Sequence, residues 1–257
     1  TQLRALLMSA TESTGALQTN CAAGLPERLS SCVHDPKDLE LVVRNGYALL
    51  HSGEHKIPLW VSEQVSRTRL AGSRLLSFVG RLFEGFSADP SLAGPRANPE
   101  DYADDRFDPG HLAAAGNITN KGDAFKAMRA ETFYLSNNAP MRKQFNRGVW
   151  LRLEQLVREW ALRYESVWSI SGPAFEVRPS PPHPVERIGE GAVSVPTHFW
   201  KVVARKHGET LRVTCFLLAN HSSEEELKTF VVPLHTVEQA IGWRLLPRAH
   251  SVTEDPV

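Results

Sequence analysis

The stretch NRGVWLRLEQLVREWALRYE, residues 146–165, has the most regular pattern of the chain and decides its architecture. Its apolar side chains recur at the spacing that places them on one face of an α-helix, and charged side chains fill the other face. The apolar stripe is therefore predicted to pack on a sheet. The stripe comprises Val149, Trp150, Leu153, Leu156, Val157, Trp160 and Tyr164, and the opposite face carries Arg152, Arg158, Glu159 and Arg163.

Strand-like runs lie on both sides of this helix. Residues 41–65 read as two strands around a turn, and three further runs, 166–175, 195–206 and 209–220, are rich in apolar and β-branched residues. A short helix is expected within 236–247. This order of elements predicts an α+β domain, with a central, largely antiparallel sheet flanked by helices.

We predict one domain over residues 40–250, preceded by an N-terminal arm over 1–39 and followed by a C-terminal tail over 251–257. Residues 71–105 are rich in Gly, Pro, Ser and Asp, which predicts a long surface loop. Long loops in compact domains often carry function.

Composition excludes several classes of protein. The 257 residues include 42% hydrophobic residues, so disorder is not expected. Lys plus Arg (29) equals Asp plus Glu (29), which gives no overall field that would attract a polyanion. No run of 18 or more apolar residues is present, so no membrane span is expected.

The three cysteines leave two interpretations open. Cys21 and Cys32 are close together in a loop-like stretch, and a disulfide between them would imply an oxidising compartment. Alternatively all three are buried thiols, which is the interpretation favoured for Cys215 within its apolar run.

The motif HSGEH, residues 51–55, fits the H-x-x-E-H pattern of inverted zinc proteases. That chemistry needs both histidines on one face of a helix, with the glutamate beside them as base. Gly53 interrupts the motif, and strand-like sequence flanks it, so a polar hairpin turn is the favoured interpretation.

The stretch FDPGHLAAAGN, residues 107–117, contains a more promising histidine. We expect Asp108, Pro109 and Gly110 to form a turn that holds His111 at a strand end, with small residues behind it that leave room for a phosphate. A neutral imidazole at that position could deprotonate a water molecule. The alternative is an ordinary structural or surface histidine.

Asn146 stands where the amphipathic helix is expected to begin, so the common interpretation is a helix N-cap. The functional alternative is a ligand for a hard cation, because Mg²⁺ accepts few protein ligands and keeps several waters. Glu154 is eight residues further on, roughly 12 Å along a helix axis. That distance favours a glutamate that holds a metal-bound water rather than the metal itself.

Six blocks of the sequence, in this order and at about these spacings, resemble the DNA/RNA non-specific endonucleases of the ββα-metal type. The resemblance covers about residues 40–248. Each block alone would be weak evidence, but six in register are specific. The blocks are FDPGHLAAAGN (107–117), AETFYLSNNAPM (130–141), FNRGVWLRLE (145–154), SGPAF (171–175), VPTHFWKV (195–202) and GWRLLP (242–247).

The resemblance implies a sugar-non-specific nuclease that hydrolyses phosphodiester bonds of DNA and RNA with one Mg²⁺, Mn²⁺ or another divalent cation. It implies that His111 is the general base, Asn146 the one direct metal ligand and Glu154 the residue that orients a metal-bound water. It also implies that Asn137 supports the histidine and the phosphate. A homodimer is possible, and the location is expected to be periplasmic or secreted, or alternatively mitochondrial.

The chain departs from the family at one position, because the family has D-R-G-H where this chain has Pro109. Loss of that arginine removes a charge-assisted contact to phosphate. Two hypotheses follow: an active nuclease in which Arg106 or Arg129 takes this role, or an impaired protein of the same fold that mainly binds nucleic acid or a partner. The predicted substrate-binding residues are Arg81, Arg106 and Asp108.

Overall fold

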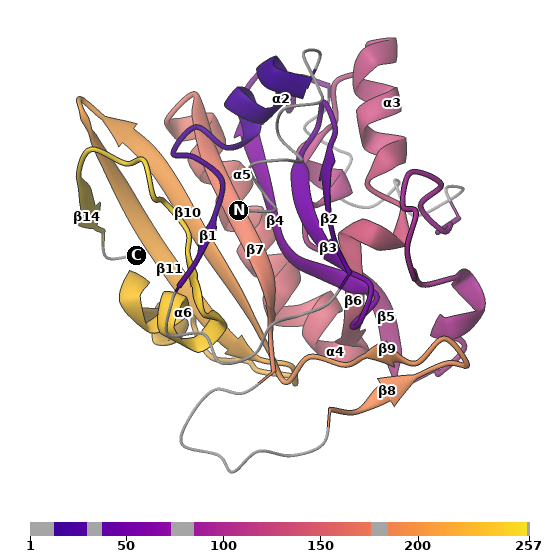
Figure 1. The fold of residues 1–257 in the computed structure, drawn as a ribbon. Coiled ribbons are helices and arrows are strands. Elements are labelled where there is room, and N and C mark those ends of the chain that lie inside the picture. The colour runs from indigo at the N-terminus through magenta and orange to yellow at the C-terminus, as the bar shows by residue number, and fades with distance from the viewer. Residues whose placement is uncertain (1–12, 30–37, 73–84, 176–184, 256–257) are drawn as a thin grey trace.

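The computed structural model describes residues 13–29, 38–72, 85–175 and 185–255. Its centre is an eight-stranded sheet with the order β12-β11-β10-β7-β4-β3-β2, in which β14 lies beside β11 (Figure 1). All pairs are antiparallel except β11 with β14. The strands are β2 Leu39–Val43, β3 Ala48–Ser52, β4 Ile57–Ser66, β7 Ser166–Ala174, β10 His198–His207, β11 Thr210–Ala219, β12 Val231–Val232 and β14 Val252–Glu254.

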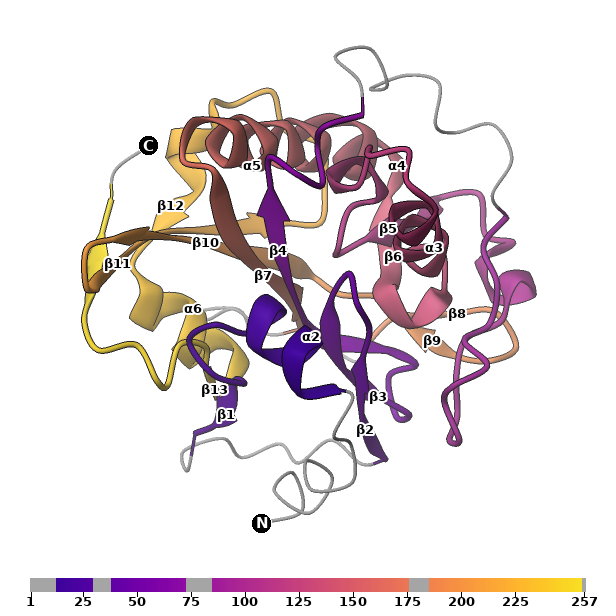
Figure 2. The ribbon, with the colours of Figure 1, turned by 90° about the horizontal axis from the view of Figure 1, so that it is seen from above.

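Helices cover both faces of the sheet, and each face has its own apolar core. The long helix α5 lies across one face, while α2 and α6 lie on the other (Figure 2). The α+β architecture with a largely antiparallel sheet is therefore confirmed. The helices are α2 Ser13–Asn20, α3 Asp123–Glu131, α4 Lys143–Phe145, α5 Leu151–Arg163 and α6 Leu234–Ile241, with 3₁₀ turns η3 Pro99–Tyr102, η4 Ala115–Asn117, η5 Leu135–Asn137 and η7 Leu227–Phe230 and a π-helical turn, η6 Asn146–Trp150.

Three two-stranded ribbons complete the fold. β5 (Phe107–His111) pairs with β6 (Asn138–Arg142), β1 (Glu27–Arg28) with β13 (Trp243–Arg244), and β8 (Arg187–Ile188) with β9 (Val193–Ser194). The predicted arm and tail both join this structure, since β1 belongs to the first and β14 to the second. The predicted boundaries at 39/40 and 250/251 remain predictions.

The helix predicted over 146–165 packs on the sheet as its stripe requires. Trp150, Leu153 and Val157 are buried, and the Trp150 ring lies 5.7 Å from the ring of Phe199 on β10. The predicted start is wrong, however. The chain turns directly from β6 into the helix at Lys143, and Arg142 occupies the N-cap position.

The strands agree with their sequence patterns. The run 41–65 contains β3, a turn and β4, as predicted, but its first residues, 41–43, belong to a further strand, β2, which pairs with β3. The three later runs contain β7, β10 and β11. The last helix is shorter than 236–247, because Gly242 takes a left-handed conformation (φ 73°) that ends α6. The residues after it pair with β1 instead.

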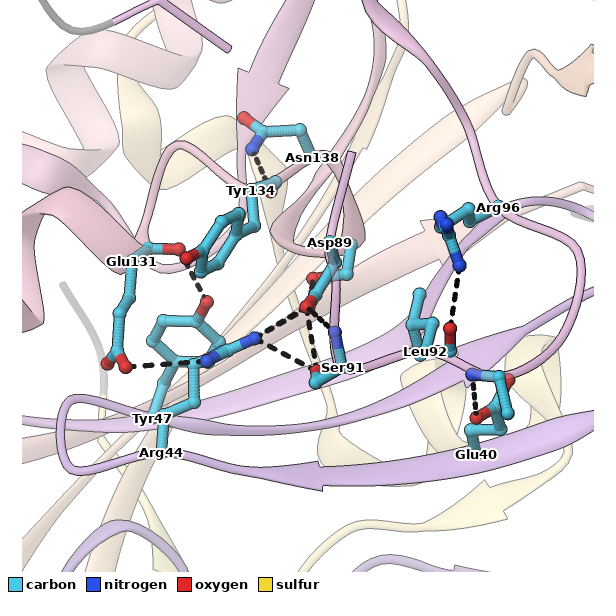
Figure 3. A network of polar contacts seen from close by, with 12 residues as sticks. Glu40, Arg44, Tyr47, Asp89, Ser91, Leu92, Arg96, Glu131, Tyr134 and Asn138 are labelled. Atoms are coloured by element: carbon cyan, nitrogen blue, oxygen red, sulfur yellow. Dashed lines mark hydrogen bonds and ion pairs between the residues drawn. The ribbon is translucent and has the colours of Figure 1, made fainter. Parts of the chain in front are cut away.

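The described part of the predicted surface loop, from residue 85 onward, has no regular element longer than η3 before β5. A buried ion pair fixes it to the sheet, since Arg44 donates to both carboxylate oxygens of Asp89 at 2.7 and 2.8 Å. Figure 3 shows this pair between Glu131 and Ser91. Ser136 of η5 also donates to Asp89, so the loop, the sheet and the segment before β6 are held together.

Cys21 and Cys215 are buried free thiols, and Cys32 lies outside the described residues. The thiol interpretation therefore holds for these two, and burial raises the pKa of Cys21 to about 11. Among the described residues no helix is both long and apolar enough to cross a membrane.

Candidate functional site

The ribbon of β5 and β6 forms one wall of the candidate site. Pro109 stands opposite Pro140, and because neither residue has a backbone N–H, no N–H donor is left unpaired at this position of the ribbon. Gly110 is required by close packing, since a Cβ there would lie 2.2 Å from the sulfur of Met141. The predicted turn at 108–110 is therefore wrong. These residues lie within β5, and the strand tolerates Pro109 because the residue opposite it is also a proline.

His111 is the last residue of β5, as expected for a histidine at a strand end. Its ring lies between Phe86 and Phe133, with centroids 5.3 and 4.9 Å away, and its Nε2 has no hydrogen-bond partner among the described residues. Burial, with a smaller contribution from the charge of Arg129, lowers the pKa of His111 to about 4. The imidazole is therefore neutral at physiological pH.

Asn137 is fully buried and holds the backbone beside His111. Its Oδ1 accepts from the amide of Ala113 at 2.9 Å, and its Nδ2 donates to the carbonyls of Ala113 and Thr132, both at 2.9 Å. The two N–H bonds of this amide are thereby used. Asn137 supports the strand end through the backbone, and this arrangement leaves no N–H for the predicted phosphate contact.

Asn146 lies one turn inside the helix, in η6, and faces β5. Its Nδ2 donates to Asp108 Oδ2 at 3.0 Å, and Arg147 pairs with the same carboxylate through Nε and Nη2, both at 2.8 Å. Although burial opposes ionisation, hydrogen bonds from Arg147 and Asn146 hold the pKa of Asp108 below its usual range. Asp108 thus orients Asn146 and pairs with Arg147, and its predicted contact with substrate stays a prediction.

This geometry fits a hard divalent cation. Because the Nδ2 of Asn146 is fixed by Asp108, its Oδ1 points to the other side of the amide as an oxygen donor. Mg²⁺ binds through one or two protein oxygens and keeps several waters, so one amide oxygen is a sufficient direct ligand. No N-cap bond competes for this side chain, since the helix begins three residues earlier.

The π-helical turn changes where Glu154 faces. Residues eight apart in a regular α-helix are about 80° out of phase, whereas one extra residue in the turn brings them to about 20°. η6 lies between Asn146 and Glu154, so both side chains project from nearly the same face of the helix. The sequence alone did not indicate this, because a π-turn has no simple residue signature. The side chain of Glu154 is 15% exposed and lies 3.9 Å from Arg158.

The predicted arginines differ in their surroundings. Arg106 is half exposed and forms ion pairs with Asp104 at 2.6 Å and Glu186 at 3.0 Å. Arg129 lies over the ring of Phe133 at 5.7 Å from its centroid, beside His111, whose pKa it lowers. Arg81 lies outside the described residues.

A buried polar cluster under α5 was missed by sequence reasoning. Glu63 on β4 and Lys201 on β10 are almost fully buried, on the sheet face that α5 covers. The signal was a charged residue at a core position of each strand pattern, within WVSEQV and HFWKVV. Trp150 connects this cluster to the site, since its Nε1 donates to the carbonyl of His111 at 3.1 Å and Lys201 lies over its ring.

The zinc-protease interpretation of HSGEH is wrong. His51 lies on β3 and His55 in the turn that follows, so the two histidines do not share a helical face. His55 Nδ1 lies 3.0 Å from the hydroxyl of Ser194, and its ring stacks on Phe175. The described residues contain no group of three or more His, Cys, Asp or Glu side chains arranged to hold a metal.

Comparison with known proteins gives one consistent result. Residues 33–250 match the family model described as DNA/RNA non-specific endonuclease. The mouse protein named "Nuclease EXOG, mitochondrial" is 33% identical over 218 residues, which cover 79% of this chain and 55% of the relative. Human "Endonuclease G, mitochondrial" is 34% identical over 216 residues, which cover 81% of this chain and 70% of the relative.

The fold of a solved relative agrees with this match. A crystal structure of the EndoG/EndoGI complex, titled as showing the mechanism of EndoG inhibition, has a TM-score of 0.73 to this structure at 26% identity, and covers 95% of this chain and 98% of that one. The chain spans a little over half the length of the three EXOG relatives from mouse, zebrafish and human. From the family match over 33–250 and these identities, the chain belongs to the DNA/RNA non-specific endonuclease family.

Proposed function

We propose that this protein is a metal-dependent nuclease that hydrolyses phosphodiester bonds of both DNA and RNA. The observation that carries the proposal is His111, a neutral imidazole at the end of β5, beside the helix that carries Asn146; within the described ranges its Nε2 has no hydrogen-bond partner. A general base must be unprotonated at working pH and must have a free nitrogen. Family membership supports the same reaction.

In the proposed reaction, His111 Nε2 accepts a proton from a water molecule as the water oxygen forms a bond to phosphorus. The bond from phosphorus to the leaving sugar oxygen breaks. Asn146 Oδ1 would hold the divalent cation, and Glu154 would orient water bound beside it, as the shared helix face supports. A bound Mg²⁺ polarises the phosphate and stabilises the leaving oxygen; Mn²⁺ or another divalent cation is the alternative.

The role of the arginine that Pro109 replaces falls, in this proposal, to Arg129. The guanidinium of Arg129 lies over the ring of Phe133, which packs against the ring of His111, and its charge lowers the pKa of His111. Arginine binds phosphate oxygens in a planar fork, so a guanidinium beside the base suits the scissile phosphate. The second candidate function is an impaired nuclease that mainly binds nucleic acid, and the observation that favours it is Pro109 itself.

A mitochondrial location is proposed because the relatives from mouse, human and yeast are named as mitochondrial nucleases. These names do not favour the periplasmic or secreted location that the sequence suggested. DNA and RNA are the proposed partners. The homodimer expected from the family stays a prediction.

The experiment that tests the function is cleavage of supercoiled plasmid and of single-stranded RNA, with Mg²⁺ and with excess EDTA. Cleavage of both substrates with Mg²⁺, abolished by EDTA, is the expected result. The protein with His111→Ala, prepared in parallel, controls for contaminating nucleases. Binding of both substrates without cleavage under any divalent cation would establish the impaired alternative.

A further inference from the structure

Beneath α5, four polar side chains form a row across the core of one sheet face. Glu63 on β4 stands opposite Ser169 on β7, and Ser171 on β7 stands opposite Lys201 on β10. Their apolar neighbours on the same face, such as Val61 and Val203, belong to the core that packs against α5. Burying a carboxylate and an ammonium group costs free energy of folding unless both are paired and hydrogen-bonded, so we asked what this row of residues does.

One set of contacts leads from this row to Glu154. Glu63 accepts a hydrogen bond from Asn117 Nδ2 at 2.8 Å, and Asn117 Oδ1 accepts from Arg158 Nη1 at 3.3 Å. Arg158 lies 3.9 Å from the carboxylate of Glu154, one helical turn earlier. Glu63 and Asn117 are each only 2% exposed, so water does not compete for the hydrogen bond between them.

A second set leads from the row to the strand end. Lys201 donates to the hydroxyls of Ser171 and Ser169 and, at 3.5 Å, to the carbonyl of Leu112, the residue after His111. Its Nζ lies 4.6 Å from the centre of the Trp150 ring, whose Nε1 bonds the carbonyl of His111. The two sets therefore end at the two sides of the candidate site.

The two sets are also coupled by charge. Burial raises the pKa of Glu63 to about 7, while the positive charge of Lys201 opposes this rise. Burial lowers the pKa of Lys201, while the charges of Glu63 and Glu154 oppose this fall. Glu154 is thus within electrostatic reach of the row, although it lies on the helix above it.

We propose that Glu63 is a positioning residue of the nuclease reaction, which acts through Asn117 and Arg158 to fix the carboxylate of Glu154. This inference rests on the proposed function and goes beyond it, because Glu63 lies in the core and touches neither substrate nor metal ligand. Removing such supporting contacts typically lowers activity by about 10- to 100-fold.

The test is a double-mutant cycle, measured as single-turnover cleavage of a labelled single-stranded oligonucleotide across a range of Mg²⁺ concentrations. Asn117→Ala is expected to lower kcat by about tenfold and to leave KM within about twofold. If Asn117 acts through Glu154, then adding Asn117→Ala to Glu154→Ala lowers the rate by less than about twofold further.

A matched pair of variants separates the hydrogen bond from packing. Glu63→Met keeps the volume but loses the acceptor, and is expected to resemble Asn117→Ala, whereas Glu63→Gln keeps an acceptor oxygen and is expected to recover most of the rate. Ser62→Ala is the control, because this neighbouring buried residue bonds the carbonyl of Asn20 on the opposite sheet face. Its rate is expected to match that of the parent protein.

Two outcomes overturn the inference in distinguishable ways. Equal losses from Asn117→Ala in both backgrounds would show that Asn117 acts independently of Glu154, and would leave the proposed function intact. A Glu154→Ala protein as fast as the parent would remove the role of Glu154 from the proposed function and this inference with it. If Glu63→Met fails to fold, the cycle with Asn117→Ala decides.

Discussion

His51 and His111 are alike in isolation and differ only in what surrounds them. Both lie at or near the end of a strand, His51 fully buried and His111 half-buried, and burial lowers the pKa of each to about 4. Both have ring nitrogens without a well-formed hydrogen bond among the described residues. His51, however, is enclosed in the hairpin of β3 and β4, while His111 lies beside the helix that carries Asn146.

In the proposed function His111 is catalytic and His51 is not, so a neutral imidazole shielded from water would not be sufficient for catalysis. His51 stands opposite Glu40 on β2, within the main sheet. The ring of His111 belongs to a separate ribbon, whose other face holds the Asp108–Asn146 contact. What distinguishes the two residues is a second element with oxygen donors, and the following predictions test this distinction.

The largest expected effect is that of His111→Ala. Loss of a general base lowers the rate by about 10²- to 10⁴-fold, whereas binding of DNA depends mainly on phosphate contacts and is retained. Plasmid cleavage and gel-shift binding measure the two quantities. His51→Leu is the matched control, expected to cleave within about twofold of the parent; an equal loss in both variants would remove the distinction.

Asn146→Ala is expected to have the next largest effect, about 100-fold on the rate, with a higher Mg²⁺ concentration needed for half-maximal activity. The physical reason is loss of the amide oxygen Oδ1 of Asn146, the proposed metal ligand, which lies on the side of the amide away from Asp108. The control is Arg147→Ala, which removes the other partner of Asp108 but no proposed ligand. An unchanged Mg²⁺ titration for Asn146→Ala would exclude it as a ligand.

Pro109→Arg is expected to raise the cleavage rate by about tenfold, because a guanidinium gains a charge-assisted bond to phosphate. Pro109 and His111 are two positions apart on β5, so their side chains project from the same face of the strand. The proline pair makes no ladder bond, so the strand tolerates the change. A rate equal to that of the parent would indicate that another cation already fills the role.

The smallest expected effect on cleavage is that of His51→Leu, whose consequence is a change in stability with pH. The folded-state pKa of about 4 lies below the unfolded value of about 6.5, so stability is fully present above pH 6.5 and falls as the pH drops toward 4. At pH 5 such a histidine lowers the free energy of unfolding by about 2 kcal/mol relative to neutral pH. Urea unfolding at pH 7.5 and 5.0 should show a smaller difference for His51→Leu; an unchanged difference would contradict the assignment.

Local sequence patterns predicted the parts of the fold that depend on side-chain periodicity. The stripe of the long helix and the alternation in β7, β10 and β11 each follow from burial of one face, so they could be identified from the chain alone. The placement of His111 at a strand end also agrees with the structure. The roles of His111, Asn146 and Glu154 came from the family resemblance and await experiment.

The sequence could not predict features that depend on partners distant in the chain. Residues 108–110 look like a turn until Pro140 is known to lie opposite Pro109. The helix start was misplaced because Arg142 is the N-cap without a side-chain bond that a capping pattern would reveal. Glu63 and Lys201 look like surface charges unless the register of three strands is known.

The direct passage from β6 into α4 has a consequence for how the protein folds. Because no loop separates them, the ribbon and the helix form one continuous segment, and the pair His111 and Asn138 closes only 27 positions of chain. The central pair of β4 and β7 joins Ser66 to Ser166, one hundred positions apart. Shorter closures lose less chain entropy, so the ribbon is expected to form before the β4–β7 pair at the centre of the sheet. His111 would then be ordered early, and the buried row beneath α5, which spans the β4–β7 pair, would be completed later.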